Sequence, residues 1–129
     1  NIIDKVKNLA LSDSVLFLGN RTDVNKILQA MDVFLLPSHY EGLPLSIVEA
    51  QAAGLPCVIS DNVPPECIKT DRVFHYSLEK PLDFWANKII EAAKIEKKDT
   101  YDEIVASGFD IKNNANKLQN FYTSFCYGE

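Results

Sequence analysis

Apolar residues follow two patterns along this chain of 129 residues. Short runs rich in strand-forming residues occupy 15–18, 33–36, 57–60 and 72–77. Such runs are typical of strands that are covered on both faces, as in a parallel sheet. Elsewhere, apolar residues recur every three or four positions, which is the spacing of a helix with one buried face. The alternation predicts an α/β fold, with a Rossmann-like, doubly wound, mostly parallel sheet flanked by helices and a helical C-terminus.

Helix boundaries are predicted from residues that start or stop helices. Thr22 or Asp23 can cap a helix, proline suits a first helical turn, and Gly54 can end a helix that starts at Pro44. The predicted helices cover 1–11, 22–31, 44–54, a stretch from Pro81, 101–106 and a stretch from Asp110.

Two of the later helices carry apolar stripes. The inner side of the helix from Pro81 is expected to hold Leu82, Trp85, Ile89, Ile90 and Ala93. The closing helix places Ile111, Ala115, Leu118, Phe121 or Tyr122, and Phe125 on one stripe. We expect this second stripe to pack on its own domain. The alternative, that its aromatic end covers a partner surface, stays open.

The helix predicted at 44–54 is apolar nearly all round, which predicts that it is buried and that Glu49, its one charge, needs a partner. The free N–H groups of Leu45, Ser46 and Ile47 would lie beside the carboxyl end of the strand at 33–36, where α/β sheets bind anions. Glu49 lies five residues after Pro44, which places it about 7 Å further along the helix axis at roughly 1.5 Å per residue. This spacing is comparable to the span from a nucleotide's pyrophosphate to its ribose diol.

At these residues the chain resembles a known family. The segment Glu41-Gly-Leu-Pro-Leu-Ser-Ile-Val-Glu49 matches the signature of two glutamates separated by seven residues in retaining glycosyltransferases with the GT-B fold, group 1 or family 4. The flanking segments 19–24, 32–38 and 49–56 also resemble that family's C-terminal, nucleotide-sugar-binding domain. The resemblance implies that residues 1–129 form this donor-binding half of a GT-B fold, and that an N-terminal acceptor domain precedes it in the full-length enzyme.

The resemblance also implies roles for single residues. Glu49 would accept hydrogen bonds from the ribose diol, and Glu41 would be the catalytic residue, facing the transferred sugar and its oxocarbenium-like centre. The backbone around the helix start would bind sugar and diphosphate, and the loop of Gly19 and Arg21 would lie near the base. The substrate-binding set is then Gly19, Arg21, Gly42, Leu43, Pro44, Leu45, Ser46 and Glu49.

Structural interpretations of the same residues remain open. Glu49 could instead pair with a buried arginine, either Arg21 or Arg72, and Glu41 could be an exposed loop residue. Arg21 could be a surface residue or a plane that stacks on the base. The two histidines, His39 and His75, are more typical of loop or packing residues, because neither has a paired nucleophile in the sequence.

Composition excludes other function classes. The net charge of −5 and the lack of a basic stripe argue against nucleic acid as a partner. No run of 18 apolar residues is present, so we expect no membrane-spanning helix in this sequence. The cysteines Cys57, Cys67 and Cys126 lack metal-ligand spacing, which favours free thiols in a reducing cytoplasm. No Asp-X-Asp triplet is present, so we expect no metal and no cofactor, with the leaving group stabilised by helix N–H groups and basic side chains.

The resulting hypothesis is a cytoplasmic glycosyltransferase domain that binds a nucleotide-diphosphate sugar, with UDP as the favoured nucleotide. Retaining transfer would go to a cell-envelope polysaccharide or lipid-linked acceptor, and the full-length enzyme could associate peripherally with a membrane. Alone, the chain should be inactive. The alternatives are a sugar-nucleotide epimerase of the same architecture, a non-catalytic nucleotide-sugar-binding domain, and a doubly wound domain without a ligand.

Overall fold

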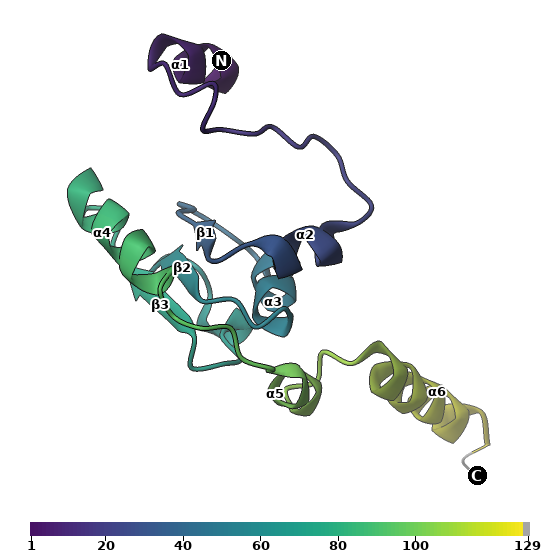
Figure 1. Ribbon diagram of the computed structural model, residues 1–129. Coiled ribbons are helices and arrows are strands. Elements are labelled where there is room, and N and C mark those ends of the chain that lie inside the picture. The colour runs from purple at the N-terminus through teal and green to yellow at the C-terminus, as the bar shows by residue number, and fades with distance from the viewer. Residues whose placement is uncertain (128–129) are drawn as a thin grey trace.

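The computed structural model describes residues 1–127, and side chains as far as residue 125. Helices and strands alternate in its middle part, and helices alone follow (Figure 1). The elements are α1 (Ile2–Asn8), α2 (Val24–Ala30), β1 (Phe34–Leu36), α3 (Leu45–Ala52), β2 (Cys57–Ser60), the 3₁₀ helix η1 (Pro65–Cys67), β3 (Val73–Tyr76), α4 (Leu82–Ala92), α5 (Tyr101–Ala106) and α6 (Ile111–Tyr127). The predicted α/β class and the helical C-terminus are confirmed.

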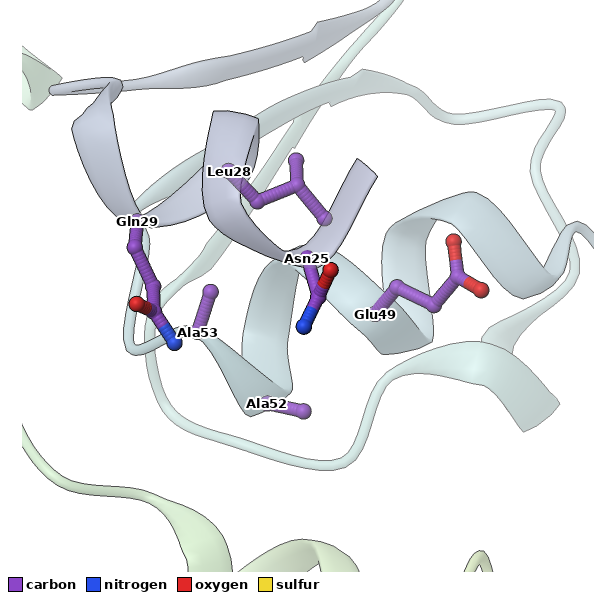
Figure 2. Close-up of a pocket in the computed structure, with 6 residues that line it drawn as sticks. All are labelled: Asn25, Leu28, Gln29, Glu49, Ala52 and Ala53. Carbon is purple, nitrogen blue, oxygen red and sulfur yellow. The ribbon is translucent and has the colours of Figure 1, made fainter. Parts of the chain in front are cut away.

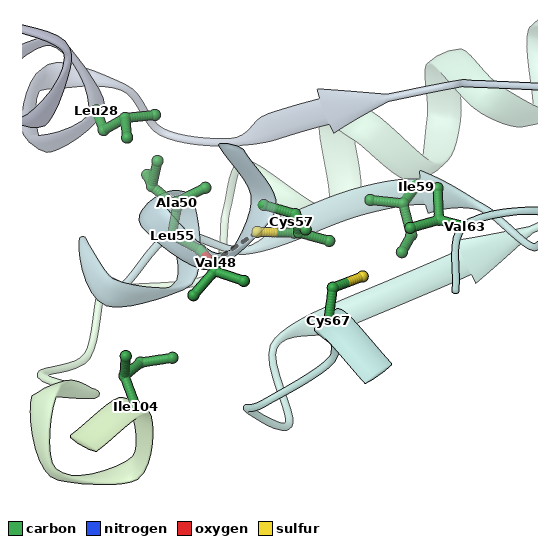
Figure 3. Close-up of a cluster of buried hydrophobic side chains, with 10 residues drawn as sticks. Leu28, Val48, Ala50, Leu55, Cys57, Ile59, Val63, Cys67 and Ile104 are labelled. Carbon is green, nitrogen blue, oxygen red and sulfur yellow. Dashed lines mark hydrogen bonds between the residues drawn. The ribbon is translucent and has the colours of Figure 1, made fainter. Parts of the chain in front are cut away.

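The three strands form a parallel sheet in the order β1-β2-β3. All four residues of the central strand β2 are fully buried, as expected for a strand covered on both faces. Because side chains alternate along a strand, Cys57 and Ile59 pack in the cluster with Ile47 of α3, whereas Val58 packs in the cluster with Trp85 of α4. The sheet is therefore a middle layer with α3 and α4 on opposite faces, and Figure 3 shows the α3 side of this core.

Helix α3 ends in a tightly closed C-terminal turn at Gly54. The N–H groups of Gly54 and Leu55 donate to the carbonyls of Gln51 and Ala50, which is the Schellman arrangement. Gly54 has φ +74°, and a Cβ at this position would collide with the carbonyl of Lys98. Glycine is therefore required here by conformation and by space.

A buried glutamine connects α3 to the segment between η1 and β3. The Gln51 side chain is fully buried, and its amide nitrogen donates to the carbonyls of Ile47 and Cys67 at 3.1 and 2.7 Å. Its oxygen accepts from the N–H groups of Lys69 and Thr70 at 2.7 and 3.0 Å. A single side chain thus supplies partners to backbone groups of Cys67, Lys69 and Thr70 in the interior of the protein.

The strand predicted at 15–18 is absent from the structure. These residues run without regular structure toward α2, and Leu16 is 85% exposed. The prediction was wrong because an apolar run forms a strand only where another strand pairs with it, and within residues 1–127 no strand pairs with this run or with the outer edge of β1.

Two apolar stripes are also less buried than predicted. In α4, Trp85 is buried and Ile89 half-buried, but Leu82 and Ile90 are exposed, as is Ala93 just after the helix. In α6, every side chain from 111 to 125 is exposed, so the stripe does not pack on its own domain as we expected (Figure 1). Hydrophobic spacing identifies the apolar face of a helix without identifying the surface that covers it.

No helix among the described residues combines the length and the apolar character needed to cross a bilayer.

Candidate functional site

The loop between β1 and α3 holds Glu41 at the carboxyl edge of the sheet. Pro37 follows β1 and has no N–H, so the backbone ladder to β2 cannot continue through it. The buried hydroxyl of Ser60, the last residue of β2, donates instead to the carbonyl of Ser38. The Ser38 hydroxyl in turn donates to Oε1 of Glu41 at 2.6 Å. The half-buried carboxylate is thus fixed to the sheet through two serines.

The first turn of α3 follows this loop and presents unpaired backbone donors. Pro44 is the N-cap, and no side chain caps this end of the helix. In the part of the chain that the structure describes, the N–H groups of Leu45 and Ser46 have no acceptor, but that of Ile47 donates to the Pro44 carbonyl at 3.3 Å. Two of the three predicted donors are therefore free. Together with the positive end of the helix dipole, they favour an anion.

Gly42 and Leu43 line the approach to this helix start, and both are exposed. Gly42 does not have a positive φ, and a Cβ placed on it would meet no atom within 4 Å. The backbone of the turn therefore does not require glycine at this position. The absence of a side chain leaves the backbone accessible to a ligand.

Glu49 is exposed on α3, which corrects the prediction of a buried carboxylate. It lies beside α2 and lines a pocket of about 200 Å³ (Figure 2). The other lining residues are Asn25, Leu28, Gln29, Ala52 and Ala53. The prediction failed because Ala52, one turn further on, is apolar by type but exposed, so the helix has an outer face that contains Glu49.

Neither arginine considered as a partner of Glu49 contacts it. Arg21 forms a bidentate pair with Asp23, with both N–O distances 2.8 Å, and this hydrogen bond lowers the pKa of Asp23. Arg72 donates to the carbonyl of Glu96. The structural interpretation of Glu49 as half of a buried ion pair therefore has no support in this geometry.

Gly19 and Arg21 lie in the exposed loop that leads into α2. Gly19 has φ +65°, a conformation that favours glycine. The bidentate pair with Asp23 uses the edge of the Arg21 guanidinium, so its flat faces remain open for stacking. The loop is joined to α2, which packs against α3. Among the described residues, the side-chain hydrogen bonds of Arg21 go to Asp23 and not to Glu41 or Glu49.

The two histidines differ in their surroundings. His39 is exposed and lines a polar pocket of about 480 Å³ that includes Asp61, Asn62 and Ser77, at the carboxyl ends of β2 and β3. His75 is exposed on β3. Among residues 1–127, no group of three or more His, Cys, Asp and Glu side chains is placed to hold a metal ion.

Two buried thiols are present in the core and are poor nucleophiles. Cys57 and Cys67 are free and buried, as predicted for these two; the side chain of Cys126 lies outside the described residues. Burial raises the pKa of Cys57 to about 12 and also raises the pKa of Cys67. A thiol with a raised pKa carries little thiolate at neutral pH, which argues against thiol chemistry at this site.

The family model described as "Glycosyl transferases group 1" matches residues 2–94, which include β1, α3 and the whole sheet. The chain belongs to the group 1 glycosyltransferases. The site built above therefore lies within the matched part of a glycosyltransferase sequence.

Curated glycosyltransferases are similar to nearly the full chain. EpsF of Bacillus subtilis (strain 168), which carries glycosyltransferase in its name, is 38% identical over 94% of this chain and 33% of its own length. The UDP-Gal:alpha-D-GlcNAc-diphosphoundecaprenol alpha-1,3-galactosyltransferase of Escherichia coli is 34% identical over 89% of this chain and 31% of its own length. The chain thus spans about one third of the length of these glycosyltransferases.

The contacts of Ser38, Ser60 and Gln51 are not predictable from the sequence pattern. A serine carries no pattern by itself, and Gln51 lies within a predominantly apolar helix. For Gln51, its position in the helix could have indicated burial. It lies four residues after Ile47 and therefore on the same side of α3, which the structure buries.

Proposed function

We propose that this chain is the donor-binding part of a retaining glycosyltransferase. It would bind a nucleotide-diphosphate sugar with the diphosphate at the start of α3 and the ribose diol at Glu49. The observation that carries the proposal is the arrangement along α3: free N–H groups of Leu45 and Ser46 at its start, and the exposed carboxylate of Glu49 one turn later on the same helix. An anion site followed by a diol acceptor matches the order of groups in a nucleoside diphosphate.

UDP is the nucleotide that we favour, and a lipid-linked or cell-envelope glycan is the favoured acceptor. The printed name of the E. coli relative specifies UDP-Gal and a diphosphoundecaprenol acceptor. A Campylobacter jejuni relative, 48% identical over 39% of this chain and 13% of its own length, is named as an N-acetylgalactosaminyltransferase that acts on a diphospho-undecaprenol acceptor. Membership of the same family supports extending this substrate class to the present chain.

In this proposal Glu41 acts on the sugar rather than on the nucleotide. Its carboxylate lies in the loop just before the anion site, where a negative charge would repel a phosphate but stabilise a positive charge that develops on the sugar. The helix N–H groups would stabilise the leaving diphosphate without a metal. The acceptor site would be provided by the remainder of the complete enzyme.

Replacing Glu49 by glutamine is expected to weaken UDP binding by about tenfold or more. The substitution removes the charge from hydrogen bonds to the ribose diol, and a bond to a charged group contributes about 1.5–3 kcal/mol. Calorimetry on the chain with UDP and 2′-deoxy-UDP, in the absence of metal, measures the effect. Wild type should lose affinity for the deoxy compound, and Glu49→Gln should lose much less.

Glu96→Gln is a matched control, because Glu96 is also exposed and lies outside α3. It should bind UDP as wild type does. If wild type and Glu49→Gln bound both nucleotides with equal affinity, Glu49 would not bind the ribose diol.

The chain alone is expected to bind UDP and to transfer no sugar. Transfer requires the acceptor to be oriented beside the donor, an effect that can supply up to about 7–11 kcal/mol of the barrier, and a single open site cannot orient it. The assay compares the chain with the complete enzyme, using labelled UDP-galactose and a diphosphoundecaprenol-linked N-acetylglucosamine acceptor.

Thermal unfolding confirms that the chain in this assay is folded. Acceptor-dependent transfer by the chain at the rate of the complete enzyme would falsify the need for a separate acceptor domain. Inversion of the sugar without acceptor would support an epimerase instead.

A further inference from the structure

The Glu41 carboxylate is connected to the sheet core through Ser38, which takes part in two hydrogen bonds. The first is the bond from the Ser38 hydroxyl to Oε1 of Glu41, at 2.6 Å. The second is the bond from the Ser60 hydroxyl to the Ser38 carbonyl. Ser60 is fully buried, and its neighbour Ile59 belongs to the core cluster. The position of Ser38 is thus set by β2 as well as by β1.

The bond from Ser38 involves one oxygen of the carboxylate only. In the part of the chain that the structure describes, no hydrogen bond involves Oε2 of Glu41. A glutamate has three rotatable side-chain bonds, so a half-buried one without such a contact would sample several orientations. Fixing Oε1 leaves Oε2 available and gives it a defined direction.

We propose that Ser38, anchored by Ser60, is a positioning residue that aims the Glu41 carboxylate at the transferred sugar. The inference rests on the proposed function, because it requires that Glu41 faces the sugar. The Ser38 hydroxyl itself does not touch the substrate. Its contribution is orientation, and a misdirected charge stabilises a developing positive charge less well.

Ser38→Ala in the complete enzyme should lower kcat by about tenfold, the lower end of the effect of a hydrogen bond to a charged group. The KM for the donor and the Kd for UDP should stay within about twofold, because the nucleotide contacts are unchanged. Ser38→Thr keeps a hydroxyl and should retain most of the activity. Ser107→Ala is the control: it also removes a half-buried serine hydroxyl, but that hydroxyl donates to the Ile104 carbonyl and not to a carboxylate, so this variant should behave as wild type.

A double-mutant comparison separates positioning from a general structural effect. If Ser38 acts through Glu41, Ser38→Ala should have no further effect in a Glu41→Ala background. Ser60→Ala should lower kcat by a smaller factor than Ser38→Ala, and should lower it no further when Ser38 is already alanine. Thermal unfolding of each variant confirms that it is folded at the assay temperature.

The assay uses UDP-galactose with the lipid-linked acceptor described above. Absence of transfer by the wild-type enzyme would overturn the proposed function itself, whereas an unchanged kcat in Glu41→Ala would overturn the role of Glu41 and the positioning role of Ser38 with it. A lowered kcat in Glu41→Ala together with an unchanged kcat in Ser38→Ala would overturn only the positioning role. An equal fall on adding Ser38→Ala to wild type and to Glu41→Ala would also overturn it, because the effect would then not depend on the carboxylate.

Discussion

Replacing Glu41 by alanine in the complete enzyme is expected to lower kcat by about 10²–10³-fold, the range found when a group that stabilises transition-state charge is removed. UDP affinity should stay within about twofold. The carboxylate is fixed by Ser38 in the loop that precedes the anion site, so its expected partner is the sugar. An interaction made chiefly in the transition state affects kcat more than substrate binding. Steady-state kinetics of transfer, together with calorimetry for UDP, separates the two quantities.

Glu96→Ala is the control for this experiment, because it removes an exposed glutamate far from the loop in sequence. It should leave both quantities unchanged. If Glu41→Ala instead weakened UDP binding as strongly as it slowed transfer, Glu41 would belong to the nucleotide site and not to the chemistry.

Replacing Gln51 by methionine should destabilise the chain by about 3–5 kcal/mol, because each buried polar group left without a partner costs about 1–3 kcal/mol. The substitution keeps the approximate shape of the side chain but removes its amide. The N–H groups of Lys69 and Thr70 and the carbonyl of Cys67 would then lose their partner. Urea unfolding of wild type and variant measures the difference.

Gln119→Met provides a matched control on α6, where the side chain is exposed. Surface substitutions usually change stability by less than about 0.5 kcal/mol. A loss in Gln51→Met no larger than that of the control would mean that water satisfies these backbone groups, and that the glutamine is not needed to connect α3 to β3.

Local signals predicted the central elements well. The strands β1, β2 and β3 were predictable because each is a short apolar run, and the ends of α3 because Pro44 and Gly54 start and stop a helix. Each of these signals is contained in a few neighbouring residues. The run at 15–18 has the same local character but forms no strand, since its state depends on a pairing partner that its own sequence does not specify. The apolar stripe of α6 was expected to pack on its own domain but is exposed. Its sequence likewise does not specify the surface that would cover it.

The position of the candidate site was predictable from the sequence, but the exposure and the hydrogen-bond partners of its residues were less so. The loop holding Glu41 and the helix start at Leu45 follow from chain order in an α/β sheet. The exposure of Glu49 did not follow, because alanine counts as apolar whether it faces the core or solvent. Ser38 and Ser60 could not be linked by sequence reasoning, because their contact arises from the parallel alignment of β1 and β2 across more than twenty residues. The roles of the site residues remain predictions.

The contacts that hold the C-terminal end of α3 bear on the entropy cost of the nucleotide binding that we propose. The Thr100 hydroxyl donates to the Gln51 carbonyl, and the backbone of Lys98 lies directly against Gly54. The helix is therefore held before any ligand arrives, and the loss of freedom on binding falls mainly on the ligand. A helix fastened in this way cannot slide along its axis to accommodate a longer or shorter ligand. Under the proposed binding mode, a ligand whose diphosphate and diol do not match the spacing along α3 should bind weakly, because the helix would not rearrange to fit it.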